Sequence, residues 1–443
     1  MQRVRLWSFS ATVLAVYLLF RRFNSKGPIL EGDMGSTKIF RSAKTILSMG
    51  AVASLLATAA WAASTTQLIY SFAGNGDGEY TDTELVMDRA GNLYGTSVQG
   101  GTFGGGTVFQ VTPAGIHTVL YNFTGGADGG EPYKGVTLDP EGNLYGTAVT
   151  GGGGSCEGGC GVVFKVTSSS GTWSQSVIHT FTGGSDGSGP GSPVAIDKQG
   201  NVWGTTPTGG ANGMGVVYQL KPDGSGGWKL RVIHTFTGGT DGGGGSASRF
   251  LIDATGNLYN VCTVGGVNGF GTVYEISPNQ GKWKFTTLYA FKDQPDGALP
   301  YGGVVADKAG NLYGTTYYAG VHDLGTVYKL TRSGATWTET VLHSFKGGTD
   351  GASPISSLVA DAAGNLYGTT SDGGAASCVC GVIFKVTRGA GGKWTESVAY
   401  QFTGAPEPGF AYNGMVRDAA GNFYGATVHG GTGNDGAIYQ FIP

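Results

Sequence analysis

Seven carboxylates recur at one position of a repeated pattern, and they have the most evident capacity for chemistry in this 443-residue chain. Each lies five residues after a Phe, in segments such as FTGGADGG, and they are Asp77, Asp128, Asp186, Asp241, Asp296, Asp350 and Glu407. Gathered on one face, they could bind an amine or a hard cation such as Ca²⁺, which prefers oxygen ligands. Alternatively, each accepts hydrogen bonds from the backbone of its own loop. Because seven uncompensated charges would repel one another, the local role is favoured. We predict no cofactor and no other metal site.

A second group of candidates lies in loops that keep their glycines while their other side chains vary, such as GGTFGGG and AGVHDLG. Variable tips on a fixed frame suit recognition, and exposed aromatic rings suit stacking against a sugar or a peptide. The candidates are Phe103, Met214, Phe270, Tyr317, Tyr318, His322, Asp323, His429 and Asp435. The alternative is that Gly-rich loops tolerate any side chain at these positions.

Three of the six histidines occupy one position of the repeat and give little sign of catalysis. Where these repeats have His179, His234 and His343, the other four have Tyr70, Tyr121, Tyr289 and Tyr400. Exchange between His and Tyr is typical of a partly buried amphipathic site rather than of a metal ligand. The sequence contains no HExxH motif. We therefore predict no catalytic residue.

Four of the five cysteines form close pairs. Cys156 and Cys160 flank EGG, and Cys378 and Cys380 flank a single Val. In an oxidising compartment, such pairs favour a disulfide within each loop. A zinc site built from all four is disfavoured, because the two loops belong to distant repeats. The fifth, Cys262, replaces a Thr of the repeat and is expected to be a buried free thiol.

A turn motif recurs in every repeat, between the segment with the loop acid and the glycine-rich loop. In segments such as DAAGNLYGTT (361–370), the Asp can accept a backbone N–H two residues on, and the Gly can adopt the left-handed conformation that ends the turn. The Asp residues are therefore interpreted as structural rather than catalytic. They are Asp88, Asp139, Asp197, Asp253, Asp307, Asp361 and Asp418.

Each repeat predicts four short β-strands, for example residues 303–307, 311–316 and 325–330, with residues 340–345 in the outermost position. The Gly-Asn pairs recur at intervals of 51 to 58 residues, within the range of propeller blades. The repeats begin with an outermost strand, residues 68–72, and end with the third strand of a blade. In a closed ring neither end is left unpaired, because the first strand pairs with the last blade and completes it. We predict an all-β, seven-bladed β-propeller over residues 64–443, with four-stranded blades and a three-plus-one closure.

Residues 1–63 precede the repeats and differ from them in composition. Residues 6–20 are apolar but short for a membrane span. From Met34, basic residues are followed by the apolar segment 45–61 and by small residues at 60–62. This order predicts a secretory signal peptide from residue 34 to about residue 62, with Met34 as the true start. The predicted location is therefore secreted or at the cell surface. The rival interpretation is membrane attachment through an uncleaved N-terminal segment.

Composition excludes some partners. The net charge is −3, and the repeats contain no run of Lys or Arg, so nucleic acid is not an expected partner. The 84 glycines occur together with 11% aromatic residues, which is typical of an ordered chain with many tight turns rather than of a disordered one. We expect a monomer.

The combination of DxxGNLYGT with FTGGxDG resembles the GloVer tandem repeat, a family of exported proteins with varied anchoring tails. The resemblance covers residues 65–443 in seven copies. It implies an exported or surface protein and brings no assigned activity with it. The sequence ends at YQFIP without an anchor, so release is expected rather than attachment. More distantly, DxxGNLY resembles blades of gluconolactonase-like and streptogramin-lyase-like propellers, a likeness of turns that implies no active site.

Three functions are compatible with this pattern. The favoured one is a binding or scaffold module whose loop face recognises a glycan, a peptide or a cell-surface protein. The alternative is an extracellular lyase or hydrolase that acts on polysaccharide. A purely structural surface component is the third. The near uniformity of the repeats and the scarcity of charge favour binding, although a fold by itself decides neither.

Overall fold

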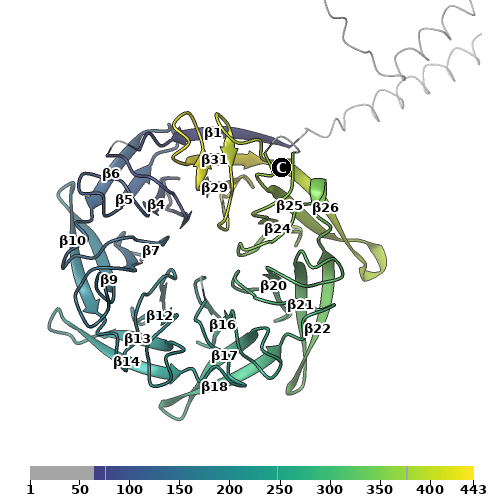
Figure 1. The fold of residues 1–443 in the computed structure, drawn as a ribbon, viewed down its shortest axis with the longest axis horizontal. Coiled ribbons are helices and arrows are strands. Elements are labelled where there is room, and N and C mark those ends of the chain that lie inside the picture. Colours follow the sequence, from purple (N-terminus) through teal and green to yellow (C-terminus); the bar gives the residue numbers. More distant parts are fainter. Residues whose placement is uncertain (1–63, 75, 247, 376–377) are drawn as a thin grey trace, which may run out of the picture. The chain divides into compact units, whose positions relative to one another are not determined.

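A computed structural model describes residues 64–443 except 75, 247, 376 and 377. Seven β-sheets stand around a central axis as the blades of a closed propeller, as predicted (Figure 1). The predicted signal peptide and the alternative start at Met34 lie outside the described residues. Within those residues, no helix is long and apolar enough to cross a membrane.

In each blade the strands run from a, nearest the axis, to d, at the rim. Blades 1 to 3 consist of β3(Val86–Met87), β4(Leu93–Ser97), β5(Thr107–Val111), β6(His117–Asn122); β7(Lys134–Leu138), β8(Leu144–Ala148), β9(Val162–Ser169), β10(Thr172–Thr180); and β11(Ala195–Ile196), β12(Val202–Thr206), β13(Val216–Pro222), β14(Trp228–Thr235). Blades 4 to 6 consist of β15(Leu251–Ile252), β16(Leu258–Cys262), β17(Thr272–Asn279), β18(Lys282–Ala290); β19(Val305–Ala306), β20(Leu312–Thr316), β21(Thr326–Ser333), β22(Thr336–Ser344); and β23(Val359–Ala360), β24(Leu366–Thr369), β25(Val382–Arg388), β26(Trp394–Gln401).

Blade 7 is the blade that closes the ring. It contains β28(Val416–Arg417), β29(Phe423–Thr427) and β31(Ala437–Ile442), and its strand d is β1(Thr65–Ser71) from the other end of the repeats. The antiparallel register runs from Thr65 opposite Ile442 to Ser71 opposite Ala437. The three-plus-one closure predicted from the strand count is confirmed.

Several short elements fall outside this scheme. β2(Thr83–Glu84) pairs in parallel with β7 and adds a fifth strand to blade 2. β27(Pro408–Gly409) pairs with β30(His429–Gly430). Two 3₁₀ turns, η1(Gly348–Asp350) and η2(Ala390–Gly392), lie in connections.

The core is divided into seven clusters, one between each pair of neighbouring blades. A fully buried Phe directly after each strand d belongs to them: Phe72, Phe123, Phe181, Phe236, Phe291, Phe345 and Phe402. The Gly of the GNLYG pattern makes room for an aromatic ring on strand c, since a Cβ on Gly95 would lie 2.7 Å from Cζ of Phe109. A ring built this way buries apolar surface at every blade interface.

Two details of the strands differ from the sequence-based expectation. Most strands a are only two residues long, as in β19 and β23, whereas five were predicted. The preceding link enters the channel in an irregular conformation, with a positive φ eight residues before each turn Asp, as at Leu299 and Ser353. Each strand d also contains a bulge, for example between Val177 and His179, which adds one unpaired residue.

Candidate functional site

The seven turn Asp residues lie on the face formed by the a–b turns. In blade 1, Oδ1 of Asp88 accepts the backbone N–H groups of Ala90 and Asn92, both at 2.9 Å. Oδ2 accepts the Asn92 amide at 2.8 Å and the Tyr94 hydroxyl at 3.0 Å. Burial raises the pKa of Asp88, but the hydrogen bonds from Asn92 and Tyr94 outweigh it and hold the pKa below its usual value. The Asp, Asn and Tyr of the motif thus form one hydrogen-bonded unit.

The loop acids lie in the d–a links, and all except Glu407 have local donors. Asp128 accepts the Tyr121 hydroxyl and the Thr124 backbone N–H, both at 2.9 Å. In blade 4, Asp296 accepts the Tyr289 hydroxyl at 2.5 Å and the Lys292 backbone N–H at 3.0 Å. The side chain of Glu407 is exposed.

The same arrangement explains the exchange of His for Tyr on strand d. His234 Nε2 lies 2.9 Å from Asp241, and His343 Nε2 lies 3.1 Å from Asp350. His179 Nε2 lies farther from its partner, 3.4 Å from Asp186. Either side chain can donate to a carboxylate seven residues later in the chain. The signal for this pairing in the sequence is the fixed spacing of seven residues between a Tyr or His and an acid.

The loop acids are distributed around the rim and neighbour the next blade. Asp296, for example, lies beside Glu339 on β22, and its charge adds to the burial that raises the pKa of Glu339 to about 7. Among the described residues, Asp350 is the one loop acid with two further potential metal ligands close by, His343 and Glu396, their ligand atoms all within 4.8 Å of one another.

The b–c loops and d–a links form one face, here called the loop face. They are joined by backbone pairs such as Gly130 with Thr150 and Ala298 with Tyr318. On this face Phe103 is 62% exposed and Tyr318 is 47% exposed. His322 and Asp323 are also exposed, and Tyr317, His429 and Asp435 are half-buried. Met214 and Phe270 differ from the expectation of exposed tips, because they pack against the clusters between blades.

Three tyrosines that are not among the predicted site residues lie at the inner ends of d–a links. Tyr133, Tyr301 and Tyr412 each precede a turn Asp by six residues. The ring centroid of Tyr301 lies 5.5 Å from that of Tyr317, which lies 4.6 Å from that of Tyr318. We call Tyr133, Tyr301, Tyr317, Tyr318 and Tyr412 the tyrosine arc.

Carboxylates lie near two of these rings. Burial raises the pKa of Tyr412, and the charges of Asp372 and Asp82 raise it further, with Tyr317 also close. Burial and the charges of Glu131 and Asp82 raise the pKa of Tyr133. Asp82 is joined by hydrogen bonds to Asn413 and Lys134, which directly follow Tyr412 and Tyr133 in the chain. The arc has members in blades 2, 5 and 7.

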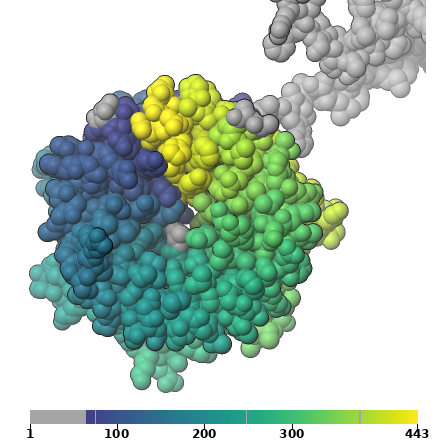
Figure 2. All heavy atoms as spheres, in the orientation of Figure 1, coloured from purple at the N-terminus to yellow at the C-terminus, as the bar shows by residue number. Residues whose placement is uncertain are grey.

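A polar network joins the same links near the axis, where the ring is hollowed (Figure 2). Lys134 Nζ lies 2.6 Å from Asp82 and 3.2 Å from Asn413 Oδ1, and Asn413 Nδ2 donates to Asp82 at 2.6 Å. Arg249 of blade 4 lies 3.6 Å from Glu84. Most repeats have Gly, Ser or Thr five residues before the turn Asp, so Lys134 and Asn413 are departures that the sequence already contained. The blades are less uniform at the channel than the repeats indicated.

Both predicted disulfides are present, Cys156–Cys160 and Cys378–Cys380. Each lies in a b–c loop of the loop face, in blades 2 and 6. Cys262 is free and buried, as predicted, and burial raises the pKa of its thiol.

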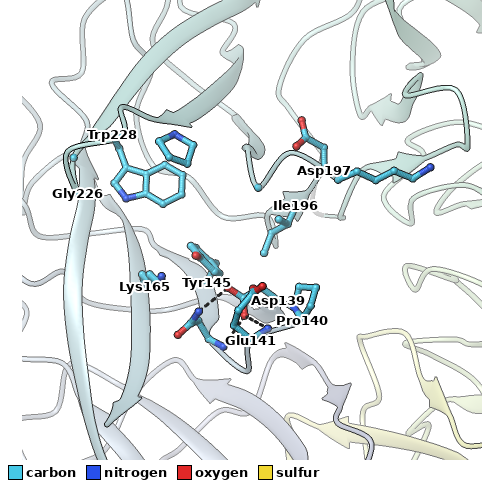
Figure 3. Close-up of a pocket in the computed structure, with 15 residues that line it drawn as sticks. Asp139, Pro140, Glu141, Tyr145, Lys165, Ile196, Asp197, Gly226 and Trp228 are labelled. Atoms are coloured by element: carbon cyan, nitrogen blue, oxygen red, sulfur yellow. Dashed lines mark hydrogen bonds between the residues drawn. The ribbon is translucent and has the colours of Figure 1, made fainter.

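A cleft of about 590 Å³ opens on the opposite face, between blades 2 and 3. Figure 3 shows Tyr145 and Trp228 on its wall, with Asp139 and Asp197 from the two a–b turns. The ring centroids of Tyr145 and Trp228 are 6.1 Å apart, and Lys165 Nζ lies 5.2 Å from the Tyr145 centroid. These acids belong to the turn unit found in every blade, so the cleft adds little chemistry of its own.

Comparisons with known proteins agree with this architecture. The extracellular domain of a one-component system from B. thetaiotaomicron superposes with a TM-score of 0.50 and 10% identity, over 85% of this chain and 40% of that chain. A protein described as a 6-phosphogluconolactonase from Bacteroides uniformis gives a TM-score of 0.47 and 15% identity, over 72% of this chain and 83% of that chain. At such identities a likeness shows the fold alone. No curated protein has a sequence that matches.

The sequence itself matches a repeat family over the whole propeller. Residues 55–174, 153–378 and 284–443 each match the Gloeobacter/Verrucomicrobia repeat, and together they extend from residue 55 to the last residue. The resemblance identified from the repeated motifs is therefore confirmed. This chain belongs to the Gloeobacter/Verrucomicrobia repeat family.

Proposed function

We propose that the protein is an exported binding module whose loop face recognises a glycan through the tyrosine arc. The observation that carries the proposal is the set of five tyrosines on the loop face, where the rings of Tyr301, Tyr317 and Tyr318 lie close together and Asp82 is joined to the residues that follow Tyr412 and Tyr133. Aromatic rings stack on the apolar faces of sugars, and carboxylates accept hydrogen bonds from their hydroxyl groups. The disulfides in two loops of this face favour an oxidising compartment, which supports export.

The arc is preferred over the cleft of the opposite face for a physical reason. Binding sites are lined mainly by apolar and aromatic side chains, with a few placed polar groups that fix the ligand. The two turn Asp residues that line the cleft are engaged within their own turns, since the Asp139 carboxylate accepts three hydrogen bonds there and that of Asp197 accepts four. On the loop face, Tyr318 is exposed beside the partly buried Tyr317.

A glycan array probed with the labelled protein tests this proposal. We expect binding to a restricted set of glycans, and we expect Tyr412→Ala and Tyr317→Ala each to weaken it by about 10-fold or more. Ile116→Ala is the matched control, because Ile116 is 62% exposed on the opposite face. No binding across the array, or binding that survives both tyrosine changes, would contradict the proposal.

The polar network favours a second candidate, an extracellular lyase or hydrolase acting on polysaccharide. Charged groups specific to single blades form ion pairs between blades here, Lys134 with Asp82 and Arg249 with Glu84. Propeller enzymes need such departures from symmetry, since identical blades cannot hold an acid and a base in different environments. Release of reducing ends from a polysaccharide panel, lost in Glu84→Gln, would support this candidate over simple binding.

A further inference from the structure

Three potential metal ligands from two blades meet at the rim of the ring. His343 lies on β22 of blade 5, Asp350 ends the turn that follows it, and Glu396 lies on β26 of blade 6. His343 Nε2 lies 3.1 Å from Asp350 Oδ2 and 3.9 Å from Glu396 Oε2. A ligand atom from each of the three lies within 4.8 Å of the others. The site is on the outer strands, apart from the tyrosine arc.

Burial leaves the Glu396 carboxyl without a sufficient partner. Its side chain is only 7% exposed, and its Oε1 atom is buried with no hydrogen-bond partner among the described residues. A buried charge is unfavourable unless it is paired. The buried Oε1 atom of Glu396 therefore requires a partner, which a bound cation would supply.

The charged groups around the pair do not remove this requirement. Lys346, which follows the buried Phe345 and is exposed, is the neighbouring cation. Its backbone N–H donates to Asp350 Oδ2 at 2.8 Å. One flexible ammonium group near the surface does not offset two carboxylates, of which one is buried.

The spacing of the ligand atoms fits a small divalent ion. In a tetrahedral zinc site with bonds of ~2.1 Å, ligand atoms lie about 3.4 Å apart. The separations of 3.1 and 3.9 Å from His343 Nε2 fall on either side of this value. One imidazole and two carboxylates suit zinc or another first-row divalent metal better than Ca²⁺, which prefers oxygen alone. The side chains of His343 and Asp350 are 14% and 19% exposed, which leaves access for a water ligand.

Equivalent positions at other blade interfaces do not combine all three ligands. Glu396 lies two residues after a Trp on strand d, and Leu230 and Phe285 occupy this position where the preceding blade supplies His179 and His234. Glu339 occupies it where the preceding blade supplies Tyr289. Within the described residues, the interface between blades 5 and 6 is the one that unites His, Asp and Glu.

We propose that His343, Asp350 and Glu396 bind one divalent transition-metal ion, with zinc as the preferred metal, and that the ion joins the outer strands of blades 5 and 6. The exchange of His for Tyr at this position of the repeat predicts that His343 is not a metal ligand. In the structure, a buried carboxylate from the next blade, that of Glu396, lies beside His343, and the exchange at the His343 position gives no sign of it.

Calorimetric titration of the chelator-treated protein with ZnCl₂ at pH 8 tests the site, since metal binding displaces protons from its ligands. We expect one bound zinc per chain and a zinc-dependent rise in melting temperature. His343→Tyr and Glu396→Gln should each weaken zinc binding by about 100-fold or more. Both substitutions install residues that equivalent positions already contain, Tyr289 and Gln175, so the fold should tolerate them.

Two further variants make the test specific. Glu339→Gln, which makes the same change at the neighbouring interface, should leave zinc binding unchanged. Leu230→Glu should add a second zinc, because His179 and Asp186 are already 3.4 Å apart there. No zinc binding by the wild type, or binding that persists in both His343→Tyr and Glu396→Gln, would overturn the proposal and leave a shared proton between the carboxyl groups.

Discussion

Replacement of Phe72 by Ala should open the ring at its closure. Phe72 directly follows β1, is fully buried, and packs between blades 7 and 1 against Leu85, Phe109 and Ile438. Its ring centroid lies 5.1 Å from that of Phe109. Truncation of a buried Phe to Ala costs about 3–5 kcal/mol. Because β1 is held to blade 7 by pairing and packing alone, we expect this loss to fall mainly on the docking of β1.

Hydrogen exchange measured by mass spectrometry checks this expectation. At about 1.4 kcal/mol per factor of ten, the loss corresponds to exchange of the β1 amides at least about 100-fold faster than in the wild type. Phe236→Ala is the matched control. Phe236 is equally buried, but its strand, β14, is joined to β13 by a hairpin and to blade 4 by the next link.

The comparison of the two variants decides the outcome. Both should lower the midpoint of denaturant unfolding, but only Phe72→Ala should release its own strand d before the rest of the ring unfolds. If the β1 amides in Phe72→Ala exchanged as slowly as in the wild type, or if Phe236→Ala released β1 equally, β1 would not be the weak point of the closure.

Three further changes test other parts of the structure. Asp361→Asn should lower the free energy of unfolding by about 1–2 kcal/mol at pH 7, because Asp361 accepts hydrogen bonds from Asn365 that hold its pKa low. This contribution to stability is fully present above ~3.9, the pKa of Asp in the unfolded chain, and is lost as the pH falls through the lower pKa of the folded state. A variant that unfolds in acid at the same pH as the wild type would refute the prediction. Glu339→Gln should act in the opposite direction, since burial raises the pKa of Glu339 to about 7. The wild type should lose stability as the pH rises from ~4.3 to about 7. At pH 8 the variant should be more stable than the wild type by about 1–2 kcal/mol, after allowance for partial solvent screening. If the wild type and the variant had the same melting curves at both pH 5 and pH 8, this prediction would be contradicted. Cys156→Ser should cost up to about 2 kcal/mol because the Cys156–Cys160 loop is short, and a reductant should lower the melting temperature of the wild type but not that of a variant lacking both disulfides.

The architecture could be predicted from the sequence because it depends on the residues that form each turn and on the number of repeats. The DxxGN turn requires Asp and Gly at fixed spacing, and Asp88 accepts the hydrogen bonds that this spacing predicts. Seven triplets and an unmatched first strand require closure by β1, and Thr65 lies opposite Ile442 accordingly. The two disulfides followed from residue pairs close in the chain. Each of these features depends on neighbours in sequence or on the number of repeats.

Only the tertiary structure decided which residues of different blades meet. The polar network joins Lys134 of blade 2 to Asn413 of blade 7, and the site at the rim joins His343 to Glu396 of the next blade. No periodicity in the sequence reports such contacts, because they depend on the orientation of each side chain at a blade interface and on the bulge in strand d. Burial of the Glu396 carboxyl beside Asp350 likewise arises only when the two blades pack. The repeats therefore determined the seven-bladed ring. The contacts made by the residues that depart from the repeat were decided only by the packing of neighbouring blades.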